Sequence, residues 1–180
     1  MAKTSATDQA NVVLAVGKET ILVQRVIEGV MSSARKADPA AVRQYIVAGD
    51  ETAAGELANA LSPSLFGELT VIVVQGIDAA TDDVGAILLT AIAAVPEHVR
   101  LVITHPGGVK GKKLLDTIKK AKVLEASCGE LKAKDLEAAV IAEFRKHNRK
   151  ATPGAITALK NSIGSGLGEL LAAVSQLCAD

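Results

Sequence analysis

Glycine and lysine residues stand together at two places where a phosphate group could bind. Val16-Gly17-Lys18-Glu19-Thr20 follows the first apolar run, and a longer segment, His105–Lys113, follows the fourth. A phosphate-binding loop needs several free backbone N–H groups, a lysine and a hydroxyl for Mg²⁺. At the first place the apolar run leads almost directly into a helical pattern, and Glu19 stands where the hydroxyl belongs. We therefore expect no nucleotide-binding residues there.

The second segment is the better candidate for an anion. The interval from Gly107 to Gly111 is one residue shorter than the spacing of a phosphate-binding loop, and Lys113 replaces the Ser or Thr. Its glycines, with Lys110, Lys112 and Lys113, could still hold an anion at a helix N-terminus or contact a DNA backbone. A solvated basic loop is the simpler interpretation, and both stay open.

The sequence predicts no catalytic set and no metal site. His98, His105 and His147 lie on or beside separate elements, without a Cys or acidic residue at the spacing of a triad or metal site, so we expect them at the surface. Asp82 and Asp83 open a helical pattern, where two carboxylates complement the helix dipole. We expect no cofactor.

The elements that must position these residues alternate between strand and helix. Five apolar runs predict strands at 12–16, 45–47, 70–74, 99–103 and 123–125, and helical spacing separates them at 20–35, 51–60, 82–94 and 111–120. Strands that are apolar throughout and joined by helices are typical of a parallel sheet covered on both faces. After Cys128-Gly129 only helical patterns remain. We predict an α/β sheet domain at 1–128 and a small three-helix domain at 129–180.

Composition limits the classes of partner. Twenty acidic residues balance twenty basic ones over 180 residues, so no net field favours nucleic acid or membrane. Residues 1–100 carry 12 acidic and 7 basic side chains, whereas residues 101–150 carry 6 and 12. The chain has no apolar run of membrane-spanning length and no signal-peptide core, and its two cysteines have no metal or redox spacing. A cytoplasmic protein without membrane contact is expected.

One segment joins scarce aromatic residues to an unusual position. Leu61-Ser62-Pro63-Ser64-Leu65-Phe66 follows a helical pattern and precedes a strand, and Phe66 is one of only two phenylalanines. Such a junction is normally solvated. The Leu65–Phe66 pair therefore either folds into the core or fills a pocket on another protein, as buried aromatic anchors do at interfaces.

The order and spacing of several segments resemble the delta subunits of bacterial DNA polymerase III clamp loaders. The resemblance covers essentially the whole chain, although none of its motifs is diagnostic alone. Its segments are Gly17–Leu22, Leu61–Phe66, Thr104–Gly108, Lys110–Leu115 and Gly168–Leu177.

The resemblance implies an AAA+-like fold, namely a five-stranded parallel sheet domain with a degenerate nucleotide site and a three-helix lid domain. The family's C-terminal collar domain would be absent. It also implies binding to the sliding clamp (the beta subunit) and favouring of its open ring during DNA replication, without ATP hydrolysis. The family's clamp-binding plug matches Leu65 and Phe66, with Leu61, Pro63 and Ser64 beside them.

Further partners implied by the resemblance are the other loader subunits, gamma/tau and delta prime, and DNA through the loader. No intrinsic catalysis is expected, although the whole holoenzyme is a DNA-directed DNA polymerase. Two alternatives stay open: an active AAA+ ATPase or nucleotide switch, and a DNA-binding module that uses the basic cluster Lys110–Lys122.

Overall fold

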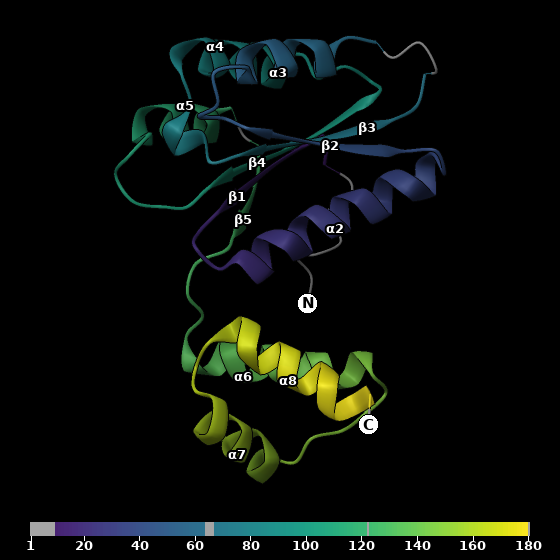
Figure 1. Ribbon diagram of the computed structural model, residues 1–180, viewed down its shortest axis with the longest axis vertical. Coiled ribbons are helices and arrows are strands. Elements are labelled where there is room, and N and C mark those ends of the chain that lie inside the picture. Colours follow the sequence, from purple (N-terminus) through teal and green to yellow (C-terminus); the bar gives the residue numbers. More distant parts are fainter. Residues whose placement is uncertain (1–9, 64–66, 122, 180) are drawn as a thin grey trace. The chain divides into compact units, whose positions relative to one another are not determined.

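The computed structural model describes residues 10–63, 67–121 and 123–179, and these form two compact units (Figure 1). The first unit comprises residues up to Lys18 together with Leu22–Cys128, and the second comprises Glu19–Ile21 with the chain from Gly129 onward. The first unit holds a sheet and its covering helices, and the second holds three helices.

The sheet of the first unit has five parallel strands. They are β1 (Val12–Val16), β2 (Val42–Val47), β3 (Thr70–Gln75), β4 (Val99–His105) and β5 (Leu124–Ser127), in the spatial order β2-β3-β4-β1-β5. The predicted α/β class with a five-stranded parallel sheet is confirmed.

Helices cover both faces of this sheet (Figure 1). α2 (Thr20–Ala37) lies on one face, and α3 (Ala53–Leu61), α4 (Asp82–Ala93) and α5 (Lys112–Lys120) lie on the other. A short 3₁₀ turn, η1 (Ile77–Ala79), follows β3. Parallel strands need such crossover helices because each connection must return to the same end of the sheet.

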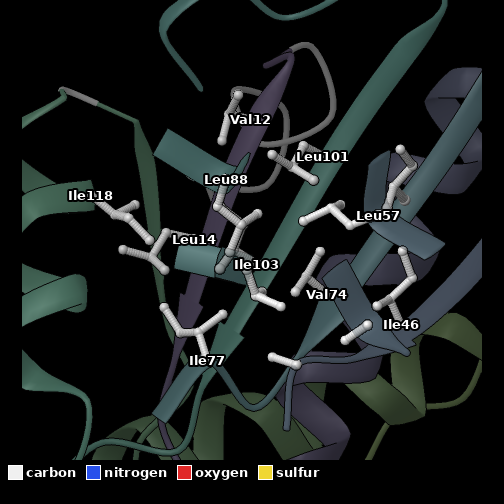
Figure 2. Packing of buried hydrophobic residues seen from close by; sticks show 14 of the residues in the cluster. Val12, Leu14, Ile46, Leu57, Val74, Ile77, Leu88, Leu101, Ile103 and Ile118 are labelled. Atoms are coloured by element: carbon white, nitrogen blue, oxygen red, sulfur yellow. The ribbon is translucent and has the colours of Figure 1, made fainter. Parts of the chain in front are cut away.

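Alternation along the central strands divides the core into two layers. Val12 and Leu14 of β1 face α3, α4 and α5, whereas Val13 faces α2. β3 and β4 alternate in the same way, since successive side chains of a strand point to opposite faces. Figure 2 shows the first layer, in which Leu14 and Ile103 pack with Leu88 of α4.

Several strand boundaries differ from the prediction. β4 ends at His105, two residues later than expected, and β2 and β5 also differ. β2 begins at Val42, three residues earlier than expected, because it is an edge strand whose partly polar sequence lacks a continuous apolar run. β5 ends at Ser127, two residues later than expected, because pairing with β1 through Ser127 continues the ladder past the apolar residues.

The helices of the second unit after Gly129 are α6 (Ala133–Lys146), α7 (Pro153–Ile163) and α8 (Leu167–Ala179). The Thr152 hydroxyl accepts a hydrogen bond of 3.2 Å from the Ala155 N–H, so it caps α7 directly before Pro153, as its sequence predicts. The buried apolar residues of this second unit are Leu136, Val140, Ile156, Leu167, Leu170, Leu171 and Val174. None of the helices in the described part of the chain is long and apolar enough to span a bilayer.

Cys128 is fully buried, and burial raises the pKa of its thiol from 9.0 to about 11. The unfolded chain therefore releases this proton at a lower pH than the folded chain does. The contribution of Cys128 to stability is complete below pH 9.0 and decreases as the pH rises toward 11.

We expect the difference in unfolding free energy between the wild type and Cys128→Ala to become smaller as the pH rises from 9.0 to about 11. Urea denaturation at a series of pH values measures it, with Cys178→Ala, at a partly exposed thiol, as the control. A difference that stays constant with pH would contradict the prediction.

Candidate functional site

The candidate clamp contact lies in the α3–β3 loop, which we define as residues 62–69. Its residues Ser64, Leu65 and Phe66 lie outside the described part of the chain. Pro63 is exposed, and Leu61 is the last residue of α3 and half-buried.

Hydrogen bonds hold both ends of the α3–β3 loop. At its start, the Ser62 hydroxyl donates to the carbonyl of Ala58 at 3.1 Å, and the His98 Nε2 atom lies 3.3 Å from the Ser62 carbonyl oxygen. At its end, the N–H of Leu69 donates to the Asp38 carboxylate at 2.8 Å, and the Leu69 carbonyl accepts from Val42 at 3.0 Å. The loop thus leaves and rejoins the scaffold at defined points.

An open apolar groove of about 410 Å³ runs beside the start of the α3–β3 loop. Leu61 lies in its wall, and α4 and the residues after it supply most of the remainder: Ala86, Ile87, Thr90, Ala91 and Pro96. α3 and α4 lie side by side on the same face of the sheet (Figure 1). Leu61, which lines the groove, directly precedes Ser62 and Pro63 in the chain.

The turn between β1 and α2 has little capacity to hold phosphate. Only Gly17, Lys18 and Glu19 separate the strand from the helix. The N–H of Gly17 donates to the His105 carbonyl at 2.9 Å, so it continues the β1–β4 ladder. A phosphate would have to compete with this internal hydrogen bond and with the Glu19 carboxylate.

The basic loop after β4 is organised around His105. The N–H of Gly107 donates to Nδ1 of His105 at 2.9 Å, which requires the imidazole proton to be on Nε2, and Nε2 donates to the Lys110 carbonyl at 3.0 Å. His105 is only 1% exposed, so the expectation of a surface position is wrong for this residue. It ends a buried strand and keeps its polar atoms satisfied by bonding to the loop.

The three candidate lysines differ in their surroundings. Lys110 pairs with Asp78 at 3.6 Å, whereas Lys112 and Lys113 are exposed in the first turn of α5. The N–H of Lys112 already donates to the Val109 carbonyl at 3.2 Å. The loop therefore offers exposed positive charges rather than a complete ring of backbone donors.

The other chemical candidates have structural roles or stand apart. Thr81 caps α4 by accepting from Val84 at 3.3 Å, and Asp82 and Asp83 follow it in the first turn as dipole partners. His98 is half-buried and His147 is exposed. The described residues contain no cluster of three or more His, Cys, Asp or Glu side chains that would hold a metal ion.

Asp38 and Thr104 are positioning residues that the sequence did not reveal. Asp38 bonds the end of the α3–β3 loop, and the Thr104 hydroxyl accepts from the Gly76 N–H at 3.1 Å. Their partners lie 31 and 28 residues away in sequence. Spacing along the chain carries no signal for such pairs.

Comparison with solved structures finds the same fold in several proteins, among them a DNA clamp loader protein and a Holliday junction motor. The DNA clamp loader delta protein of Bacillus subtilis matches 98% of this chain with a TM-score of 0.70 and 16% identity. The chain shares the fold of this protein. It spans 55% of the Bacillus protein, so it corresponds to about half of that length.

The RuvB Holliday junction branch migration motor of Thermotoga maritima also has this fold, with a TM-score of 0.55 and 12% identity over 96% of this chain and 57% of RuvB. A gamma subunit-related DNA polymerase III protein of the same organism matches 81% of this chain and 51% of its own length, with a TM-score of 0.50 and 15% identity. The expected AAA+-like architecture is therefore confirmed as a fold. No protein-family model and no curated protein sequence matches the chain.

Gly111 joins the basic loop to the rest of the sheet domain and tolerates no side chain. Its φ is +67°, and a Cβ atom would lie 2.5 Å from the Cα of Asp78. We expect Gly111→Ala to reduce the unfolding free energy by about 2–4 kcal/mol through backbone strain and overpacking. Chemical denaturation measures the change.

The matched control is Gly108→Ala, because Gly108 has a similar φ of +88° and no atom within 4 Å of the added Cβ. Only the left-handed conformation should cost stability there, about 1–2 kcal/mol. Equal losses in the two variants would show that the contact with Asp78 is unimportant.

Proposed function

We propose that this chain is a delta-type clamp-loader protein that binds a sliding clamp through Leu65 and Phe66 and favours the open ring during DNA replication. The observation that carries the proposal is the clamp-loader delta fold over 98% of the chain, in which the α3–β3 loop supplies an adjacent Leu–Phe pair. ATP hydrolysis is no part of the proposed role.

The loop is suited to this role by its fixed ends and by its composition. The hydrogen bonds at Ser62 and Leu69 fix the two ends of the loop, and Pro63 restricts the backbone two residues before Leu65. Burial of a Leu and a Phe side chain contributes about 1.5–3 kcal/mol each. Leu61 and the exposed Pro63 extend this contact toward the groove along α4.

Opening of the clamp follows from linkage. A ligand shifts a two-state equilibrium only by the difference between its affinities for the two states. The plug therefore favours the open ring to the extent that its pocket is better formed there. Other loader subunits of the gamma/tau and delta prime types would then control when the plug is accessible.

An ATPase or nucleotide switch has less support from the site. The β1–α2 turn is three residues long, Glu19 lies within it, and its Gly17 N–H already bonds to His105. These are properties of the residues that a nucleotide would have to contact. They favour action by contact over action by phosphate chemistry.

Replacing the plug should weaken clamp binding selectively. We expect Leu65→Ala with Phe66→Ala to lower affinity for the cognate clamp by a few kcal/mol, roughly a hundredfold or more, with little change in thermal stability. Isothermal calorimetry measures the affinity. Leu177→Ala is the control, because Leu177 is a 60% exposed leucine in the second unit.

The opposite pattern would overturn the proposal. If the double variant lost several degrees of thermal stability while its clamp affinity stayed normal, Leu65 and Phe66 would be core residues. The proposed contact would then have no anchor.

The exposed lysines of α5 support a secondary contact with DNA phosphates. Lys112 and Lys113 are free to move toward a phosphate backbone, and Lys110 is held near Asp78. Such contacts release counterions, so each one makes binding more sensitive to salt.

We expect Lys112→Ala with Lys113→Ala to reduce the slope of log affinity against log salt by about 0.9 for each lost phosphate contact. Adding Lys110→Ala should change the slope less, because Lys110 pairs with Asp78. Fluorescence anisotropy with duplex DNA measures the slope. An unchanged slope would exclude these lysines as DNA contacts.

A further inference from the structure

The edge strand β2 leaves apolar side chains in solvent. Val42 is 44% exposed, Tyr45 is 41% exposed and Val47 is 48% exposed. Among the described residues, the other large hydrophobic side chains this exposed are Val109 and Leu177. Three of the five therefore gather on one short strand.

Within the described part of the chain, the outer side of β2 also presents main-chain groups that pair with no further strand. The N–H groups of Val42 and Ala48 donate to the carbonyls of Leu69 and Gln75, so the even-numbered residues bond toward β3. Arg43, Tyr45 and Val47 then direct their N–H and C=O groups outward. The Val47 carbonyl also accepts from Asp50 at 3.0 Å and keeps a second lone pair.

Common features that protect an edge strand are missing from β2. It contains no proline and no lysine. Its one charged residue, Arg43, pairs with Glu28 of α2 and lies over the Tyr45 ring at 5.2 Å from the centroid. Arg43 is thus neutralised and directed away from the free edge. The exposed main chain is complementary to a further strand.

The outward residues are arranged symmetrically about Tyr45. In an antiparallel pair of two β2 strands, Tyr45 faces Tyr45 of the other copy, and Arg43 faces Val47 twice. This register pairs every outward main-chain group of Arg43, Tyr45 and Val47, and it places no like charges directly opposite each other. The strand is therefore complementary to itself.

Charges beyond the two ends of β2 also favour an antiparallel arrangement of the two strands. Arg35 and Lys36 close α2 before the amino end of β2, and Asp50 and Glu51 follow its carboxyl end. All four are exposed. An antiparallel arrangement brings the basic end of one copy toward the acidic end of the other, whereas a parallel one brings like charges together.

We propose that β2 pairs antiparallel with β2 of a second copy of this chain, across a two-fold axis at Tyr45. The two five-stranded sheets become one continuous ten-stranded sheet. Because β2 and the plug residues differ, this association is independent of the proposed clamp binding.

Sedimentation equilibrium of the full chain, from low micromolar to near-millimolar concentration, tests the pairing. We expect a dimer that weakens as the salt concentration rises. Tyr45→Lys removes an aromatic pair and places like charges at the axis, so dimerisation should weaken about tenfold or more. Val109→Lys is the control, since Val109 is 86% exposed on a loop away from β2. Dimerisation of this variant should equal that of the wild type.

Hydrogen exchange checks the location without any substitution. The amides of Arg43, Tyr45 and Val47 should gain protection as concentration rises, whereas that of Val109 should not. A wild-type chain that stays monomeric throughout, or a dimer that Tyr45→Lys leaves intact, would overturn the proposal. A monomer would leave the edge available to a strand of a different protein.

Discussion

Burial of the central strands on both faces is the constraint on which the rest of the sheet domain depends. β1, β3 and β4 carry apolar side chains toward both layers, and nearly all of them are buried. Such strands are stable only when helices cover both faces, so α2 must lie on one side and α3, α4 and α5 on the other. Because the strands are parallel, the amino ends of all strands lie along one side of the sheet and the carboxyl ends of all strands lie along the opposite side.

This polarity separates the two candidate regions. The α3–β3 loop precedes β3, and His98, which contacts Ser62, precedes β4. Both lie on the side of the sheet where the amino ends of the strands meet. The β1–α2 turn and the basic loop follow β1 and β4 at the opposite edge. Ser62 of the α3–β3 loop and the lysines Lys112 and Lys113 therefore lie at different ends of one sheet.

Internal hydrogen bonds occupy the edge where parallel α/β sheets commonly bind ligands. Gly17 bonds to the His105 carbonyl, the His105 ring bonds to Gly107 and Lys110, and Gly76 bonds to Thr104. These contacts tie the ends of β1, β3 and β4 to one another. These donors and acceptors, which a nucleotide would otherwise contact there, serve the fold.

Local sequence determined the type and order of the elements, because apolar runs and helical spacing depend on neighbouring residues. It located β1 and α8 closely and placed Thr152 as the cap of α7. It was less informative for β2, in which Ile46 is the one buried residue, and wrong for His105, whose burial depends on a loop folding back over it. Tertiary structure alone decided the strand order, the anchoring of the α3–β3 loop by Asp38 and His98, and the open edge at Tyr45. The physical reason is that these features are contacts between residues tens of positions apart, which form only when the two-layer core brings the strands together.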